Sequence, residues 1–132
     1  MSVFSWPVRI YWEDTDAGGV VYHANYVRFM ERCRTEWLRA QGIDQFALRQ
    51  ATGLGFVVRE MGLDFLRPAR LDDELLVTLA VKERRSASML FGQEIVRGDT
   101  TLLRATVRVA CVNLDAMRPA QIPADLFRPE FL

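Results

Sequence analysis

Hydrophobic and polar residues recur with a helical period in one stretch of the chain and alternate as in strands over most of the remainder. Between residues 26 and 40, apolar side chains recur on one helical face and charged side chains on the other. The apolar face comprises Tyr26, Met30, Cys33, Trp37 and Ala40, and the charged face comprises Arg28, Glu31, Arg32, Arg34 and Arg39. The pattern predicts one amphipathic helix of about four turns, with Asn25 as its N-cap and Gly42 just beyond its end.

Strand-like patterns lie on both sides of this helix. A first strand is predicted at residues 8–12, and a short second helix at 44–51. Four further strands are predicted at residues 55–66, 74–83, 87–97 and 101–113. Gly98-Asp99 is expected to join the last two strands through a tight hairpin. The tail 119–132, which contains three prolines, is expected to lie on the surface.

The order of these elements predicts the architecture. The connections between the last four strands are too short for parallel crossovers, so we expect a mainly antiparallel, five-stranded sheet. The long helix must bury its apolar face, and the concave face of that sheet is the available surface. The 132 residues then form a single α+β domain of ordinary size. The sheet keeps exposed edges and an uncovered face, which favours self-association as a homodimer or homotetramer.

Composition and charge restrict the class of protein. Half of the residues are apolar, 26% are charged, and the formal net charge is zero, so no overall field attracts nucleic acid or an anionic membrane. The first residues lack the features of a signal peptide, and no apolar run approaches the ~18 residues of a membrane span. We therefore expect a cytoplasmic protein. Cys33 and Cys111 fit no ligand spacing and are expected to be reduced core residues.

The segment from Glu13 to Asn25 is the most unusual part of the sequence, because three carboxylates in four residues precede two glycines and the start of the helix. One interpretation is a solvated acidic turn. A calcium loop is excluded because Ala17 and Gly18 supply no further acid, and Asn25 stands where such loops carry a bidentate Glu. A single histidine in the chain also excludes a His-rich metal site. No metal is therefore expected.

The start of the helix suggests a functional interpretation of the same segment. Free backbone N–H groups and the positive end of the helix dipole can hold a developing oxyanion. Asp16 lies seven residues before His23, close enough for its carboxylate to fold back toward the same point. A carboxylate beside such donors suffices for acyl transfer, with the carboxylate as nucleophile or as general base.

These residues also carry a family resemblance. The stretch VRIYWEDTDAGGVVYHANYVRFMERCRTEWL, residues 8–38, resembles the opening of the YbgC-type acyl-CoA thioesterases of the 4-hydroxybenzoyl-CoA thioesterase family, which has the hotdog fold. The segment FLRPARLDD, residues 65–73, resembles the loop before the family's third strand. The similarity in strand order extends through residue 114. The resemblance implies a hotdog fold in which the sheet wraps one long central helix.

The resemblance also implies a role for individual residues. Asp16 matches the catalytic aspartate, and the backbone N–H of His23 matches the amide that polarises the thioester carbonyl. The imidazole of His23 is expected to orient a catalytic group or a water. Trp12 replaces a tyrosine that is frequent in the family, which keeps an aromatic wall but removes a hydroxyl. Glu31 is a further candidate, because a second hotdog subgroup uses a helical glutamate as its catalytic carboxylate, but the presence of the DTDAGG segment in this sequence favours Asp16.

Substrate binding can be assigned only to candidate residues. Trp12, Tyr22 and Phe56 are expected to line an acyl pocket. The phosphates of coenzyme A call for basic side chains, and Arg84-Arg85-Ser86 is the preferred candidate, followed by Arg67 and Arg70. Coenzyme A enters as part of the substrate, so no separate cofactor is expected. Asp14 is interpreted as an acceptor in a turn or helix cap.

The predicted activity is the hydrolysis of acyl-CoA thioesters to a free acid and coenzyme A, at a site between subunits. Two alternatives remain open. One is a hotdog hydratase or dehydratase, which would pair a histidine with an acid. The other is a non-catalytic module that binds acyl-CoA or acyl carrier protein and is associated with the Tol–Pal envelope system. The sequence leaves open the acyl chain, the thiol carrier and whether Asp16 attacks directly or activates water.

Overall fold

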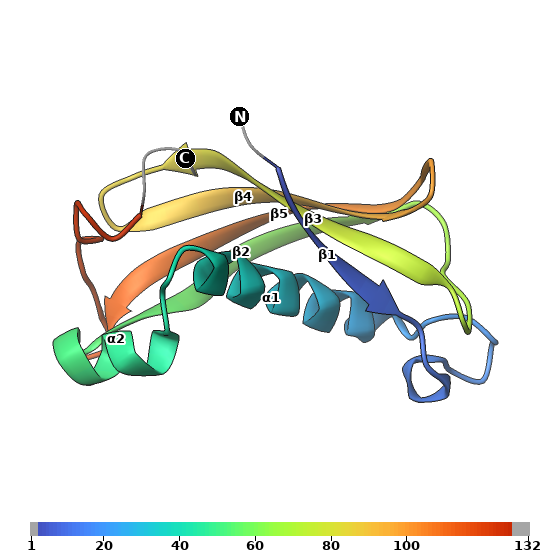
Figure 1. Cartoon of the computed structure of the whole chain (residues 1–132), viewed down its shortest axis with the longest axis horizontal. Coiled ribbons are helices and arrows are strands. Elements are labelled where there is room, and N and C mark those ends of the chain that lie inside the picture. Colours follow the sequence, from blue (N-terminus) through green and yellow to red (C-terminus); the bar gives the residue numbers. More distant parts are fainter. Residues whose placement is uncertain (1–2, 128–132) are drawn as a thin grey trace.

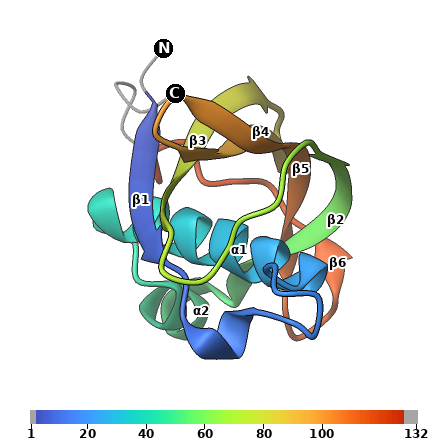
Figure 2. The same cartoon turned by 90° about the vertical axis from the view of Figure 1, so that its right-hand side faces the viewer.

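A curved antiparallel sheet wraps around one long helix in the computed structural model, which describes residues 3–127. Figure 2 shows the sheet curling around α1 (His23–Ala40) on three sides. The other elements are β1 (Phe4–Arg9), η1 (Trp12–Asp14), α2 (Gln45–Thr52), β2 (Leu54–Phe65), β3 (Glu74–Arg84), β4 (Ser88–Arg97), β5 (Thr100–Asn113) and β6 (Arg118–Pro119). The predicted α+β architecture and the packing of α1 inside the sheet are confirmed.

The sheet has the strand order β1-β3-β4-β5-β2, and β6 pairs with β5 beside this path. Every pairing among the described strands is antiparallel, as the short connections predict. β6 is only two residues long and has no signal in the sequence pattern. β1 and β2 are the edges of the main path, and β2 keeps one edge of a 12-residue strand unpaired within the described chain.

The core lies between α1 and the concave face of the sheet. On α1, four of the five predicted apolar positions are buried, while Ala40 at the last turn is exposed. Inward-facing residues of β3 and β5 are buried as the alternation predicts: Leu75, Val77, Leu79 and Val81, and Leu103, Ala105, Val107, Val109 and Cys111. Periodicity therefore identified most of the core.

Arg34 is a correction to the predicted charged face, because its side chain is buried rather than solvated. The guanidinium donates from Nη1 to Oε1 of Gln93 at 3.0 Å, and Gln93 Nε2 donates to the Met30 carbonyl at 3.2 Å. Burial lowers the pKa of Arg34, and the nearby Glu31 carboxylate opposes this shift. This polar pair links the helix to the centre of β4.

Two boundaries near the start of the chain also differ from the prediction. β1 runs from Phe4 to Arg9 instead of residues 8–12, and Pro7 is tolerated because β1 is an edge strand that pairs only with β3. The chain then turns into η1, where the Asp14 carboxylate accepts from the Tyr11 backbone N–H at 2.8 Å. This bond stops the extended conformation before residue 12.

The ends of the two helices are largely as expected. α1 begins at His23, so Asn25 lies in its first turn and the N-cap position belongs to Tyr22. The prediction of Asn25 as N-cap is therefore wrong: its side-chain amide donates to the Asp14 carbonyl at 3.0 Å. Gly42 follows α1 with φ +80°, as expected for the residue after a helix. The second predicted helix is confirmed as α2.

The described part of the tail is not wholly on the surface, which corrects the prediction for residues 119–132 as far as the structure describes them. Ile122 and Phe127 are both 3% exposed and belong to the core cluster. Ala120 N–H donates to the Cys111 carbonyl at 2.9 Å, and Ile122 N–H donates to the Ser86 carbonyl at 2.7 Å. The segment is therefore held against the end of the sheet.

Two further expectations concern cysteines and membranes. Cys33 and Cys111 are both free and buried, so their interpretation as core residues is confirmed. Burial raises the pKa of the Cys33 thiol to about 12. Between residues 3 and 127, no helix has the length and apolar character needed to cross a bilayer.

Candidate active site

Asp16 lies in a tight loop directly before α1. Thr15 and Val21 form an antiparallel bridge that closes this loop. Within it, the Asp16 N–H donates to the Val20 carbonyl at 2.9 Å, and the Gly19 N–H donates to the Asp16 carbonyl at 3.0 Å. The loop is therefore a small hydrogen-bonded turn that presents residue 16 at a fixed place.

The Asp16 side chain is exposed, and its Oδ1 accepts from the Gly18 backbone N–H at 2.8 Å. Among the described residues, Oδ2 has no hydrogen-bond partner and is free to meet a substrate or a water. A Cβ atom at Gly18 would lie 3.1 Å from Oδ1, so a side chain there would crowd the carboxylate. Gly19 has φ +80°, a conformation that favours glycine. Both glycines thus serve the geometry of this carboxylate.

The amino end of α1 supplies hydrogen-bond donors beside the loop. The Asn25 N–H is taken by the Tyr22 carbonyl at 2.9 Å, whereas within residues 3–127 no acceptor is bonded to the backbone N–H of His23 or Ala24. The first turn contains no acidic side chain to compensate the positive end of the helix dipole. These two amides are therefore available for an oxyanion.

Side chains around this helix end are aromatic and open. The rings of Tyr22 and His23 lie against each other with centroids 4.7 Å apart, and both residues are exposed. Trp12 is 80% exposed in η1, immediately before the acidic loop. The structure thus brings Asp16, Tyr22 and His23 together, with Trp12 nearby in the chain.

The loop between β2 and β3 braces the segment that carries Asp16. The Val21 N–H donates to the Ala69 carbonyl at 2.9 Å, and the Ala69 N–H donates to the Tyr26 hydroxyl at 3.0 Å. Burial raises the pKa of Tyr26, and the negative charges of Asp73 and Asp16 add to the shift, against the Ala69 hydrogen bond and Arg97. Sequence reasoning did not assign Tyr26 this role, because its apolar position indicated only packing.

An ion pair fixes the other end of the same loop. Arg97 Nη1 lies 2.8 Å from Asp73 Oδ2, and the same carboxylate oxygen accepts from the Arg70 backbone N–H at 2.9 Å. Burial tends to raise the pKa of Asp73, but this hydrogen bond and the Arg97 guanidinium hold it below its ordinary value. The loop that resembles the family's FLRPARLDD segment is therefore a support for the Asp16 loop.

Asp14 acts as the structural acceptor that the sequence predicts. Its side chain accepts from the Tyr11 N–H, and its carbonyl accepts from the Tyr22 N–H at 3.0 Å and from the Asn25 amide at 3.0 Å. These bonds tie η1 to the start of α1. Asp14 therefore helps to place the loop and leaves Asp16 as the free carboxylate.

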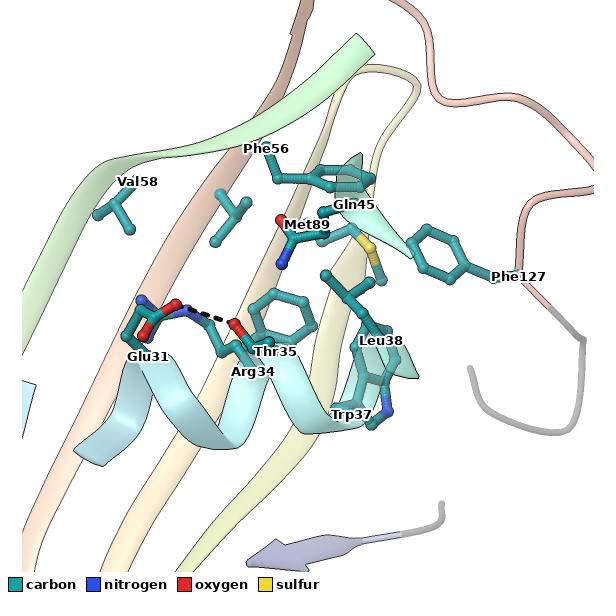
Figure 3. Close-up of a pocket in the computed structure, with 12 residues that line it drawn as sticks. Glu31, Arg34, Thr35, Trp37, Leu38, Gln45, Phe56, Val58, Met89 and Phe127 are labelled. Carbon is teal, nitrogen blue, oxygen red and sulfur yellow. Dashed lines mark hydrogen bonds between the residues drawn. The ribbon is translucent and has the colours of Figure 1, made fainter. Parts of the chain in front are cut away.

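Phe56, the third residue expected in the acyl pocket, lies elsewhere in the single chain. It borders a cavity of about 120 Å³ between the second half of α1 and the sheet, together with Glu31, Arg34, Thr35, Trp37, Leu38, Gln45, Val58, Met89, Phe91, Val109 and Phe127 (Figure 3). Glu31, Gln45 and Val58 are exposed at the border of this space, so it is a surface pocket between α1 and the sheet.

Glu31 lies at the border of this cavity and is exposed. Its carboxylate accepts from the Thr35 hydroxyl at 2.8 Å, as the dashed line in Figure 3 marks. Glu31 lies eight residues beyond His23, about 12 Å along the helix. Within one chain, the helical glutamate and the Asp16 loop are therefore separate.

The candidate phosphate ligands fall at both ends of the sheet. Arg84, Arg85 and Ser86 are exposed at the turn between β3 and β4, at the end of the molecule opposite the Asp16 loop (Figure 1). Arg84 lies over the Phe127 ring at 5.6 Å, and Arg85 pairs with Glu83. Arg67 and Arg70, the second choice, are exposed in the loop that braces residues 15–21. Within one chain, Arg67 and Arg70 therefore lie in the loop that contacts the Asp16 segment, whereas Arg84 and Arg85 lie at the opposite end of the molecule.

No group of three or more potential metal-ligating His, Cys, Asp or Glu side chains occurs in the part of the chain that the structure describes. The arrangement around Asp16 instead offers one carboxylate oxygen, two free backbone amides and open aromatic side chains. Chemically, this is a nucleophile or general base beside an oxyanion site.

Comparison with known proteins places this geometry in a family. A family model described as the thioesterase-like superfamily matches residues 10–129. The acyl-CoA thioesterase YbgC of Haemophilus influenzae is 48% identical over 123 residues, which cover 93% of this chain and 90% of that protein. The acyl-CoA thioester hydrolase YbgC of Escherichia coli is 48% identical over 126 residues, which cover 95% and 93%. The crystal structure of a probable thioesterase from Bartonella henselae superimposes with a TM-score of 0.88 at 35% identity, covering 92% of this chain and 100% of that one.

Proposed function

Because the chain belongs to the thioesterase-like superfamily, as an acyl-CoA thioesterase of the YbgC type, we propose that Asp16 and the amino end of α1 hydrolyse its acyl-CoA thioester. The hotdog fold and the thioester hydrolase activity follow from this membership. The observation that supports the site is the free Oδ2 of Asp16 in a hydrogen-bonded loop that ends at the start of α1, where two backbone amides are unbonded within the described residues.

In this mechanism, the thioester carbonyl oxygen accepts hydrogen bonds from the backbone N–H groups of His23 and Ala24. The Asp16 carboxylate attacks the carbonyl carbon or takes a proton from the attacking water. If water attacks, the C–S bond breaks and the acyl group leaves directly as the free acid. If Asp16 attacks, breaking the C–S bond leaves the acyl group on Asp16 as a mixed anhydride, which water then hydrolyses to the free acid and the Asp16 carboxylate. In both routes coenzyme A leaves as a thiolate that takes up a proton. The helix end stabilises the negative charge that develops on the carbonyl oxygen, which is where such donors act most strongly. The exposed imidazole of His23 orients the water or the carboxylate.

The site requires a second copy of the chain. In one chain Asp16, Tyr22 and His23 are exposed, whereas thioester hydrolysis needs a site that holds the acyl group and excludes bulk water. The unpaired edge of β2 can continue the sheet into a second copy related by a two-fold axis. The two α1 helices then run antiparallel, and the start of one approaches the middle of the other. We therefore propose a homodimer, or a dimer of dimers, with the site between subunits.

The proposed dimer reconciles the separated candidate residues. The pocket beside Phe56 is lined in part by Val58 of β2, which is exposed, so the edge that meets the second copy also borders the pocket. Trp12 and Tyr22 of one copy and Phe56 of the other then border the same acyl group. Arg84, Arg85 and Ser86 lie at the end of the sheet that approaches the second copy's Asp16 loop, where they bind the phosphates of coenzyme A. The proposed location is the cytoplasm, and acyl carrier protein is a second thiol carrier to test.

The test is free-thiol release from a panel of acyl-CoA thioesters by the wild type and by Asp16→Asn. The substitution removes the nucleophile or base while keeping the size of the side chain, so kcat is expected to fall by a factor of ~100 or more. Glu13→Gln is the matched control, because it removes a neighbouring exposed charge from the same segment and is expected to retain activity.

Three results would each have a clear meaning. A selective loss in Asp16→Asn supports the assignment of Asp16. Activity of Asp16→Asn close to that of the wild type overturns that assignment and makes Glu31→Gln the next variant. If the wild type releases no thiol from any acyl-CoA, acyl carrier protein thioesters replace coenzyme A thioesters in the same assay.

A further inference from the structure

One side of the pocket beside Phe56 is formed by Phe127, which lies outside α1 and the main sheet. Phe127 is 3% exposed, and its ring centroid lies 5.4 Å from that of Trp37 and 6.2 Å from that of Phe56. The segment that precedes it is anchored by the Ile122 N–H bond to the Ser86 carbonyl. Phe127 therefore forms a wall of the pocket from a segment that backbone hydrogen bonds attach to the sheet.

The two ends of the cavity differ in chemistry. Figure 3 places Glu31 and Arg34 at one end, near Val58 of the free edge strand. Phe56, Met89 and Phe127 lie toward the other end. Charged side chains therefore lie at the end near the sheet edge, and aromatic and sulfur-containing side chains predominate at the other end, where Gln45 is the polar exception. This distribution fits an acyl group that enters with its carbonyl at the charged end and its hydrocarbon tail among the apolar side chains.

The ring of Phe127 is the obstacle that such a tail meets. It borders the pocket and packs against Trp37 and Phe56, so a chain that extends past these two side chains contacts Phe127.

We propose that Phe127 of one subunit sets the length of the acyl chain accepted at the Asp16 of the other subunit. This inference rests on the proposed function. The second subunit is needed because the residues that border the cavity begin eight positions beyond His23 on α1, about 12 Å away. An acyl group bound at the Asp16 of the same chain would have to span that distance, whereas the β2 edge that meets the second copy borders the pocket.

The first experiment measures kcat/KM for saturated acyl-CoA thioesters from two to twelve carbons with the wild type and three variants. Phe127→Ala and Phe127→Leu shorten the wall, so the longest chain accepted is expected to increase, with kcat/KM for a chain beyond the wild-type limit rising by ~10-fold or more. Phe127→Trp extends the wall and is expected to shift the profile toward shorter chains. Phe46→Ala is the matched control, because Phe46 is 73% exposed and does not border the cavity.

The series stays informative if one variant fails to fold, since the leucine and tryptophan variants change the wall in opposite directions. Unchanged chain-length profiles in folded, active variants would overturn the role of Phe127 and leave the thioesterase function intact. An inactive wild type on every acyl-CoA would instead count against the proposed function, and the inference would fall with it.

A second experiment tests which subunit supplies the wall. A hybrid of wild-type chains with chains carrying both Asp16→Asn and Phe127→Ala is isolated with two affinity tags. If the wall acts across the interface, the single intact Asp16 faces the shortened wall, and the hybrid shows the longer-chain profile of Phe127→Ala. A wild-type profile in the hybrid would mean that Asp16 uses the Phe127 of its own chain, and would overturn the arrangement between subunits.

Discussion

Removal of the Tyr26 hydroxyl should destabilise the protein by removing the hydrogen bond that joins the β2–β3 loop to α1. Tyr26 is 4% exposed and Ala69 is fully buried, and the hydroxyl is the acceptor for the Ala69 N–H at 3.0 Å. In Tyr26→Phe this buried N–H loses its partner, which costs ~1–3 kcal/mol. For a chain of this length, 1 kcal/mol lowers Tm by about 4 °C, so Tm should fall by ~4–12 °C.

The assay is urea and thermal unfolding followed by circular dichroism, with Tyr11→Phe as control because the Tyr11 side chain is 61% exposed. The denaturant m-value should stay constant, since the same surface unfolds in both proteins. Because Ala69 also accepts from Val21 at the end of the Asp16 loop, kcat for thiol release should fall in Tyr26→Phe and not in Tyr11→Phe. Equal unfolding midpoints for the two variants would refute the reasoning that this hydrogen bond braces the site.

Two further predictions concern ionisable groups outside the proposed chemistry. Burial tends to raise the pKa of Asp73, but the Arg70 N–H and the Arg97 guanidinium hold it below its ordinary value. The ionised Asp73 therefore stabilises the folded protein at pH values above the ordinary carboxyl pKa of ~3.9. This stabilisation is lost as the pH falls through the lowered pKa. The difference in urea midpoint between wild type and Asp73→Asn should accordingly shrink between pH 6 and pH 3, and a constant difference would contradict this. Burial raises the pKa of Cys33 to about 12, so at pH 8 only about one Cys33 thiol in 10⁴ is ionised. Cys33 should therefore react slowly with a disulfide reagent in the native protein and fast in the urea-unfolded protein. Rapid reaction of Cys33 in the native protein would disprove its burial.

Much of the fold could be predicted because α1 and four strands carry strong periodic signals. The stripe that begins at Tyr26 and the alternation in β5 each specify which face is buried. The first strand was misplaced because its two ends depend on one long-range strand pairing and one local hydrogen bond. β1 is defined by pairing with β3, some 70 residues away in sequence, and it ends where the Asp14 carboxylate captures the Tyr11 N–H. Neither choice is visible in hydrophobic periodicity.

The parts of the candidate site also differ in whether a local sequence pattern predicts them. Asp16, the glycines and the helix start lie within eight residues, so a local pattern contains both the carboxylate and the donors. The hydrogen bond between Tyr26 and Ala69 joins residues 43 positions apart. The aromatic contact of Phe127 with Trp37 joins the tail to α1. The three prolines of the tail predicted a surface segment, whereas backbone bonds to the Cys111 and Ser86 carbonyls hold its described part against the sheet. Composition alone gave no signal for either contact.

The exposure of Asp16 and of the start of α1 in one chain limits the electrostatic stabilisation that the proposed mechanism requires. Two unit charges 4 Å apart interact by about 1 kcal/mol in bulk water and by ~4 kcal/mol at an effective dielectric constant of 20. The amino end of α1 therefore stabilises a developing oxyanion several times more strongly once a second surface covers it. In the proposed dimer, that cover comes from the β2 edge, where Val58 and Phe65 are each nearly half exposed in the single chain. In the proposed mechanism, the DTDAGG segment supplies the reacting carboxylate, whereas the exclusion of water on which it depends is a property of the proposed dimer.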